Sequence, residues 1–216
     1  MKKIKLKHIG NLLGVILLLV ILFNPDVKAW FNQQFMKLGF HKPDLEMKDN
    51  NAVAAQEINE EAQNVNETIE NAVSVPKKPS VWFMDSFGKE LDAANQHGKV
   101  VFINFWATWC PPCLAEMPSI DKLHEKFKDR DDIVFFMVDV DGKLIESGEF
   151  MVRKKLNLPV HIAKDRIPEY WLGSSIPTTV ILDKKGEMVV RHEGMADYSS
   201  SDVFDFIQEL LDENAS

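Results

Sequence analysis

The chain has 216 residues, of which 33 are acidic and 25 are basic, giving a formal net charge of −8 at pH 7. This balance argues against nucleic acid as a partner, because no basic patch with interleaved aromatic residues accompanies it. The sequence contains two cysteines, which excludes a framework of several disulfides and a four-thiolate zinc site.

The N-terminus combines basic residues with an apolar run. Four lysines between positions 2 and 7 precede an uncharged stretch from Ile9 to Phe23. Counted from Ile4, with lysine side chains extending toward the headgroups, the stretch reaches the roughly 20 residues that cross a bilayer. We therefore predict a single-pass membrane anchor within residues 1–28, with the basic end in the cytoplasm and the following chain outside the cytoplasmic membrane. The alternative is a signal peptide that is cleaved after Val27-Lys28-Ala29.

Two segments of different character follow the predicted anchor. In residues 29–43, the aromatic and apolar positions between Ala29 and Phe40 suit a short amphipathic helix lying on the membrane surface, or else an extension of the anchor helix. Residues 44–78 are rich in Asn, Glu, Gln and Ala and contain no aromatic residue, which predicts a flexible acidic linker. The remaining residues, 79–216, are long enough to bury one core.

This C-terminal region alternates between strand-like and helix-like patterns. The apolar runs predict an edge strand at 81–84, further strands at 100–106, 133–140, 158–163, 178–182 and 188–192, and helices at 114–127, at 143–156 and from 199–201 onward. Alternating strands and helices followed by a hairpin predict an α/β fold, with a mixed sheet covered on both faces.

The two cysteines form a Cys110-Pro111-Pro112-Cys113 motif between a predicted strand and a predicted helix. This spacing lets the two sulfurs bond with little backbone movement. The helix N-terminus favours a thiolate on Cys110, although Pro111 and Pro112 leave fewer backbone donors for it. The motif predicts thiol–disulfide exchange, in which Cys110 attacks a substrate disulfide and Cys113 resolves the mixed disulfide.

The segment FWATWCPPCLAEMP resembles the active site of the thioredoxin superfamily, specifically its membrane-anchored TlpA/ResA-like branch. The run from Ser175 to Thr179 resembles the cis-proline loop that faces the CxxC in that superfamily, and Pro118 matches the proline that kinks its active-site helix. The resemblance covers about residues 79–213. It implies a thioredoxin-like fold, a central mixed sheet flanked by helices, with an added helix and strand. We place this insertion in residues 142–172 and expect it to contribute to substrate choice.

The resemblance also suggests roles for individual residues. Asn104 stands where many thioredoxins have a buried, titrating Asp, so another group must serve the second cysteine. Our hypothesis is that Glu116, one helical turn after Cys113, tunes that thiol or accepts its proton; the alternative is a solvated Glu that the helix dipole favours. We expect Pro177 to be cis and to present the substrate peptide. The residues expected to contact substrate are Trp109, Pro111, Pro112, Ile176 and Thr178.

At the level of function, the resemblance implies an enzyme whose substrates are exported proteins with thiols or disulfides. It further implies action as a reductase in cytochrome c maturation or similar thiol maintenance, with electrons from a membrane-embedded donor. We expect no metal and no other cofactor. The alternative is a redox-inactive module of the same fold, which uses the thiol pair to bind a partner or handle a metal.

Overall fold

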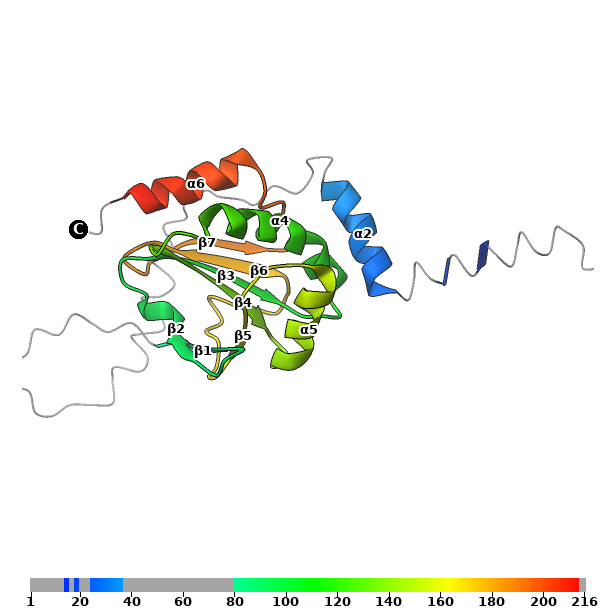
Figure 1. The fold of residues 1–216 in the computed structure, drawn as a ribbon, viewed down its shortest axis with the longest axis horizontal. Helices are drawn as coiled ribbons and strands as arrows, with labels where there is room; N and C mark the ends of the chain where they lie inside the picture. The colour runs from blue at the N-terminus through cyan, green and yellow to red at the C-terminus, as the bar shows by residue number, and fades with distance from the viewer. Residues whose placement is uncertain (1–13, 16–17, 20–23, 37–79, 214–216) are drawn as a thin grey trace, which may run out of the picture.

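The computed structural model describes residues 14–15, 18–19, 24–36 and 80–213. These residues form a seven-stranded sheet with the order β2-β1-β5-β4-β3-β6-β7 (Figure 1). The strands are β1 (Trp82–Asp85), β2 (Glu90–Asp92), β3 (Val100–Trp106), β4 (Ile133–Asp139), β5 (Val160–Ala163), β6 (Thr178–Leu182) and β7 (Met188–Glu193). Strands β3, β4 and β5 run parallel, and the other neighbours pair antiparallel. The predicted mixed α/β sheet is therefore confirmed.

Strand β3 lies inside the sheet and leads to the CxxC motif. All seven of its residues are buried, because β4 and β6 pair with its two edges and both of its faces are covered. A strand in this position needs apolar side chains on both faces, which explains its continuous apolar run. The exception is Asn104, which is fully buried although it is polar. The motif therefore begins a few residues after a strand that is buried along its whole length.

Helices α4 (Pro111–Phe127), α5 (Leu144–Lys154) and α6 (Ser201–Asp212) pack on one face of the sheet. Their buried apolar residues belong to one cluster, together with Val100 and Phe102 of β3. The opposite face has a second cluster, which is covered by the 3₁₀ helix η2 (Ala93–Asn95) and by the loop that holds Trp171. The sheet is covered on both faces, as expected. However, helices were predicted to flank it, whereas the second face is covered by the indole of Trp171 and the short helix η2.

The insertion and the first strand differ in detail from the prediction. The insertion consists of α5 and β5, as expected, but α5 ends at Lys154, where Lys155 adopts a left-handed conformation with φ 57°. Strand β5 lies between β4 and β1, so β1 is not the edge strand that the sequence predicted. The edge is β2, which pairs with β1 through a tight turn held by the Asp85 carboxylate.

Helix α2 (Pro25–Met36) packs beside α4, on the outer side of the domain (Figure 1). Ala29 is buried in the main apolar cluster, and the Asp26 carboxylate lies 2.8 Å from the Lys154 ammonium of α5. The aromatic rings of Trp30, Phe31 and Phe35 are exposed. The helix thus begins four residues before the predicted surface segment, and it is docked on the domain formed by residues 80–213.

The membrane anchor predicted within residues 1–28 lies mostly outside the described residues, and the linker predicted at 44–78 lies wholly outside them. Within the part of the chain that the structure describes, none of the helices has both the length and the apolar character that crossing a bilayer requires.

Candidate active site

The two cysteines form a disulfide at the start of α4, with their Cα atoms 5.3 Å apart. Cys110 is the N-cap of the helix, and its sulfur accepts a hydrogen bond from the backbone N–H of Cys113 at 3.3 Å. Cys110 is 3% exposed, whereas Cys113 is completely buried. A partner can therefore approach Cys110 first, which fits its predicted role as the attacking thiol.

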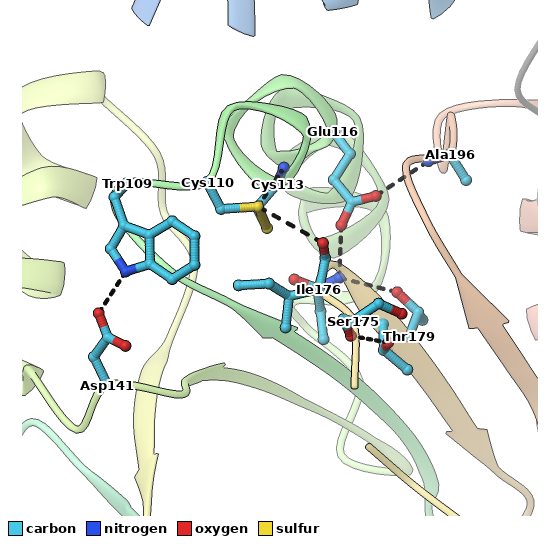
Figure 2. The surroundings of a disulfide bond; sticks show 11 residues. Trp109, Cys110, Cys113, Glu116, Asp141, Ser175, Ile176, Thr179 and Ala196 are labelled. Carbon is cyan, nitrogen blue, oxygen red and sulfur yellow. Dashed lines mark hydrogen bonds between the residues drawn. A yellow bond between two sulfur atoms is a disulfide. The ribbon is translucent and has the colours of Figure 1, made fainter. Parts of the chain in front are cut away.

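The loop before β6 faces this disulfide (Figure 2). The Ile176–Pro177 peptide bond is cis, as predicted. The carbonyl oxygen of Ile176 lies 3.9 Å from the Cys110 sulfur, and the carbonyl of Pro177 accepts from the N–H of Gly194. The loop therefore brings a backbone edge, at Ile176, next to the Cys110 sulfur.

Trp109, adjacent to Cys110, is 57% exposed, so its ring lies open beside the disulfide. Its indole Nε1 donates to Asp141 Oδ2 at 2.6 Å, and the backbone N–H of Asp141 donates to Asp139 Oδ1 at 2.7 Å. Asp139 is buried and is in turn hydrogen-bonded by the hydroxyl of Ser147 on α5. The Trp109 ring, which forms an apolar platform beside the Cys110 sulfur, is thus oriented by the loop between β4 and α5.

Glu116 lies on the other side of the disulfide from Trp109 (Figure 2), and it is fully buried instead of solvated. Its carboxyl oxygens accept from Asn104 Nδ2 at 2.7 Å and from the N–H of Ala196 at 3.1 Å. Desolvation by burial raises the pKa of Glu116 to about 8, because the two hydrogen bonds that favour the charged form offset burial only in part. A carboxyl with this pKa can gain and lose a proton in the range where thiols ordinarily titrate.

A second layer of buried hydroxyls supports Asn104 and Glu116. Thr179 Oγ1 accepts from Asn104 Nδ2 at 2.9 Å and from the Tyr198 hydroxyl at 2.7 Å. Ser119 donates to the Glu116 carbonyl and accepts from the Tyr198 N–H. Desolvation, followed by the charge of Glu116, raises the pKa of Tyr198, so this hydroxyl stays protonated. Thr179 was predicted only as part of the cis-proline loop, and Ser119 and Tyr198 were not predicted at all, because these residues become neighbours only through the fold.

The other predicted residues occupy different positions. Pro111 and Pro112 are half-buried in the first turn of α4, and Pro118 lies inside the same helix. Trp106, at the end of the predicted strand 100–106, is in the core. Thr178 was expected to contact the substrate, but it is fully buried and its hydroxyl donates to the Ser175 carbonyl at 2.8 Å. We therefore assign Thr178 a role in shaping the loop.

A strand that leads into a helix-capping CxxC, opposite a cis-proline loop, defines a domain of the thioredoxin superfamily. A model of the Redoxin family matches residues 59–205, and the chain belongs to this family. It is 35% identical over 113 residues to the thiol-disulfide oxidoreductase ResA of Bacillus thuringiensis (strain Al Hakam), which covers 51% of this chain and 64% of that protein. It is 32% identical over 131 residues to ResA of Bacillus subtilis (strain 168), covering 56% and 73% of the two chains. The resemblance to the TlpA/ResA-like branch is thereby confirmed.

Solved structures show the same fold. The thiol:disulfide interchange protein of the thioredoxin family from Chlorobium tepidum TLS superposes with a TM-score of 0.52 and 24% identity, covering 65% of this chain and 99% of that one. The chain spans just under two thirds of the length of the first Bacillus relative.

Proposed function

We propose that this chain is a thiol–disulfide oxidoreductase that reduces exported proteins outside the cytoplasmic membrane. The observation that carries the proposal is the position of Cys110: its sulfur caps α4 and lies 3.9 Å from the Ile176 carbonyl. An extended substrate peptide can pair with this backbone edge while its disulfide meets the sulfur. The relatives named ResA support the same chemistry.

In the reductive direction, the Cys110 thiolate attacks one sulfur of the substrate disulfide and the other substrate sulfur leaves as a thiolate. Cys113 then gives up its proton and attacks the Cys110 sulfur, which breaks the mixed disulfide and releases the second substrate thiol. Two electrons pass to the substrate, and the enzyme ends as the Cys110–Cys113 disulfide seen in the structure. We assign Glu116 the role of accepting the Cys113 proton, since it lies one helical turn away in the same buried region.

Each further cycle requires two electrons from a donor, and we propose that a membrane-embedded thiol carrier supplies them. Apoproteins of c-type cytochromes, whose haem-binding cysteines must be reduced, are the substrate class that we propose first. The helix α2 supports a retained anchor over a cleaved signal peptide. Cleavage after Ala29 would cut this helix at a residue that is buried in the domain.

Helix α2 also fits a position at the membrane surface. Its exposed side carries Trp30, Phe31 and Phe35, while the polar Asn32 and Gln33 are half-buried. A helix in water normally shows the opposite arrangement, whereas aromatic rings at a lipid–water interface are favourable. Val15, Leu18 and Leu19, just before α2, are helical and exposed, as expected of an apolar segment in contact with lipid.

A trapping experiment tests the chemistry. In the full-length chain, Cys113→Ala should accumulate mixed disulfides through Cys110 with exported proteins, visible on non-reducing gels. The matched control, Cys110→Ala with Cys113 intact, should accumulate far fewer because Cys113 is buried. If neither variant forms mixed disulfides, the alternative of a redox-inactive binding module is favoured.

The equilibrium reduction potential of the Cys110/Cys113 pair tests the direction of exchange. Known pairs range from about −270 mV in thioredoxin to about −120 mV in a strong oxidant. A value near the lower end supports a reductase, and one near the upper end contradicts it. Separately, N-terminal sequencing of the mature chain tests the anchor, since a start at Trp30 would contradict its retention.

A further inference from the structure

Asn104 has one half of its side-chain amide satisfied and the other half not. Its Nδ2 donates one hydrogen to Glu116 Oε1 at 2.7 Å and the other to Thr179 Oγ1 at 2.9 Å. Among the described residues, none donates a hydrogen bond to its Oδ1, although this atom is buried. A buried acceptor without a partner costs free energy. The hydrogen bonds of the amide therefore do not by themselves explain why it has the observed orientation.

The observed orientation suits an ionised Glu116. A carboxylate can only accept, and both of its oxygens do so, from Asn104 Nδ2 and from the N–H of Ala196. Once Glu116 is protonated, its O–H group must donate, and an amide NH₂ cannot accept. The contact between Asn104 and Glu116 is then mismatched unless the amide turns.

Rotation of the Asn104 amide by half a turn repairs this mismatch. The oxygen then occupies the present place of Nδ2, between Glu116 and Thr179, and it can accept from both. Thr179 is able to donate in that arrangement because its hydroxyl hydrogen rotates freely and its oxygen still accepts from Tyr198 at 2.7 Å. The NH₂ group moves to the place where Oδ1 now lacks a partner, so one end of the amide is unpaired in either orientation.

We propose that Asn104 is a positioning residue that reverses its amide with the protonation of Glu116: the NH₂ group faces the carboxylate, and the carbonyl oxygen faces the carboxylic acid. The unpaired Oδ1 carries this inference, because an amide that was satisfied at both ends would lose bonds on turning. The turn exchanges hydrogen bonds and transfers no electrons.

Few other groups around Glu116 could hydrogen-bond to its carboxyl or exchange a proton with it. On its own helix, the neighbouring titratable group is the thiol of Cys113 in the reduced protein. The loop before α6 contributes Tyr198, which stays protonated because burial raises its pKa. From the sheet, β6 contributes the hydroxyl of Thr179, and His192 of β7 lies opposite Thr179 in the strand register.

The switch explains how a residue that cannot titrate replaces a titrating one. Asn104 offers a hydrogen-bond partner to both forms of Glu116. The buried carboxyl can therefore gain or lose a proton without losing its hydrogen bond to Asn104. Burial raises the pKa of Glu116 to about 8, so both forms occur near that pH. The inference concerns Glu116 itself and can be tested in the oxidised protein; only its link to the Cys113 proton rests on the proposed function.

The direct test is neutron diffraction from deuterated crystals of the oxidised protein, at about two pH units below and above the pKa of Glu116. Deuterium positions distinguish the nitrogen of the amide from its oxygen. We expect Oδ1 to face a protonated Glu116 at the lower pH and Nδ2 to face the carboxylate at the higher pH. The same orientation at both pH values would overturn the proposal.

A second test uses the pKa of Glu116, followed by ¹³C NMR of the labelled carboxyl in the oxidised protein. A switching amide stabilises both forms, so Asn104→Leu should move this pKa by less than about one pH unit. A fixed NH₂ donor stabilises the carboxylate alone, and losing it should raise the pKa by about one unit or more, which contradicts a switch. Thr179→Ser, which keeps the hydroxyl, is the matched control and should retain the wild-type value.

Discussion

The backbone N–H of Cys113 donates to the Cys110 sulfur at 3.3 Å, which makes the second cysteine a stabiliser of the first. This N–H belongs to the third residue of α4, and the two residues before it are prolines without an N–H group. An N-cap side chain ordinarily accepts from the second or third residue of its helix. Cys110 therefore has one of these two donors, and Pro112 occupies the place of the other.

Replacing Pro112 should strengthen the Cys110 thiolate. In Pro112→Ala, the new N–H can donate to the thiolate, so the reduced form gains stability and the reduction potential should rise by about 10–40 mV. The potential is measured by equilibration with glutathione or dithiothreitol buffers. Pro111→Ala is the matched control, because an N–H at the first helical position does not point at the cap side chain. An unchanged or lower potential in Pro112→Ala would contradict this account.

The buried carboxyl of Glu116 should make the folded protein less stable as the pH rises. The pKa of Glu116 is raised to about 8, against 4.5 ordinarily, so near neutral pH the folded protein holds a proton that the unfolded chain has released. Unfolding then releases a proton, and raising the pH favours it. Burial also lowers the pKa of His161 to about 4, which makes stability rise with pH, but only below about 6.5.

Between about pH 6.5 and about pH 8, the change of stability with pH therefore reports mainly the titration of Glu116. We expect the free energy of unfolding, measured in urea, to fall by about 1–2 kcal/mol across it. In Glu116→Gln this slope should disappear, whereas Glu125→Gln, a partly exposed site on the same helix, should keep it. A wild-type stability that is flat or rising over this interval would refute the assignment.

The contact between Trp109 and Asp141 should matter for peptide substrates and not for small disulfides. Asp141→Ala removes the acceptor that orients the indole, so kcat/KM for a disulfide-containing peptide should fall about 3- to 10-fold. Reaction with a small disulfide, which needs no platform, should be unchanged. Asp141→Asn keeps an acceptor oxygen and should largely retain activity. Equal losses with both kinds of substrate would point to a damaged CxxC instead.

The docking of α2 should depend on Ala29 more than on its ion pair. Asp26 and Lys154 are both well exposed, so Lys154→Ala should change stability by less than about 0.5 kcal/mol. Ala29 is buried against the main core, so Ala29→Asp places a charge there and should release the helix. Amide hydrogen exchange reports the outcome: protection in residues 25–36 should be lost in Ala29→Asp and kept in Lys154→Ala.

The parts of this fold that could be predicted from sequence are those governed by local patterns. Strand β6 begins and ends where alternation placed it, and α6 begins within the range predicted for its start, with Ser200 as its N-cap. The CxxC identified the two sulfurs that form the disulfide, because spacing and helix position alone define that motif. The cis-proline loop followed from its short signature.

What could not be predicted depends on contacts between distant residues. Asn104 and Thr179 are 75 positions apart, and Glu116 and Ala196 are 80 apart, so no local pattern joins them. No sequence pattern singled out Asp141, although an acidic residue just beyond the carboxyl end of a buried parallel strand lies at the edge of the sheet where sites gather. Strand β2, with three residues, is too short to show alternation.

Because helix α2 is docked on α4, the length of residues 37–79 does not set how far the active site can move from its point of attachment. If the segment joined a free anchor to a free domain, a chain of its length would let the active site range over a radius of about 35 Å from its point of attachment. With α2 held on α4, both ends of the segment belong to the same body. In the anchored arrangement that we propose, the distance of Cys110 from the membrane is then set by α2, and deletions or insertions within residues 37–79 should leave the disulfide within reach of the proposed donor.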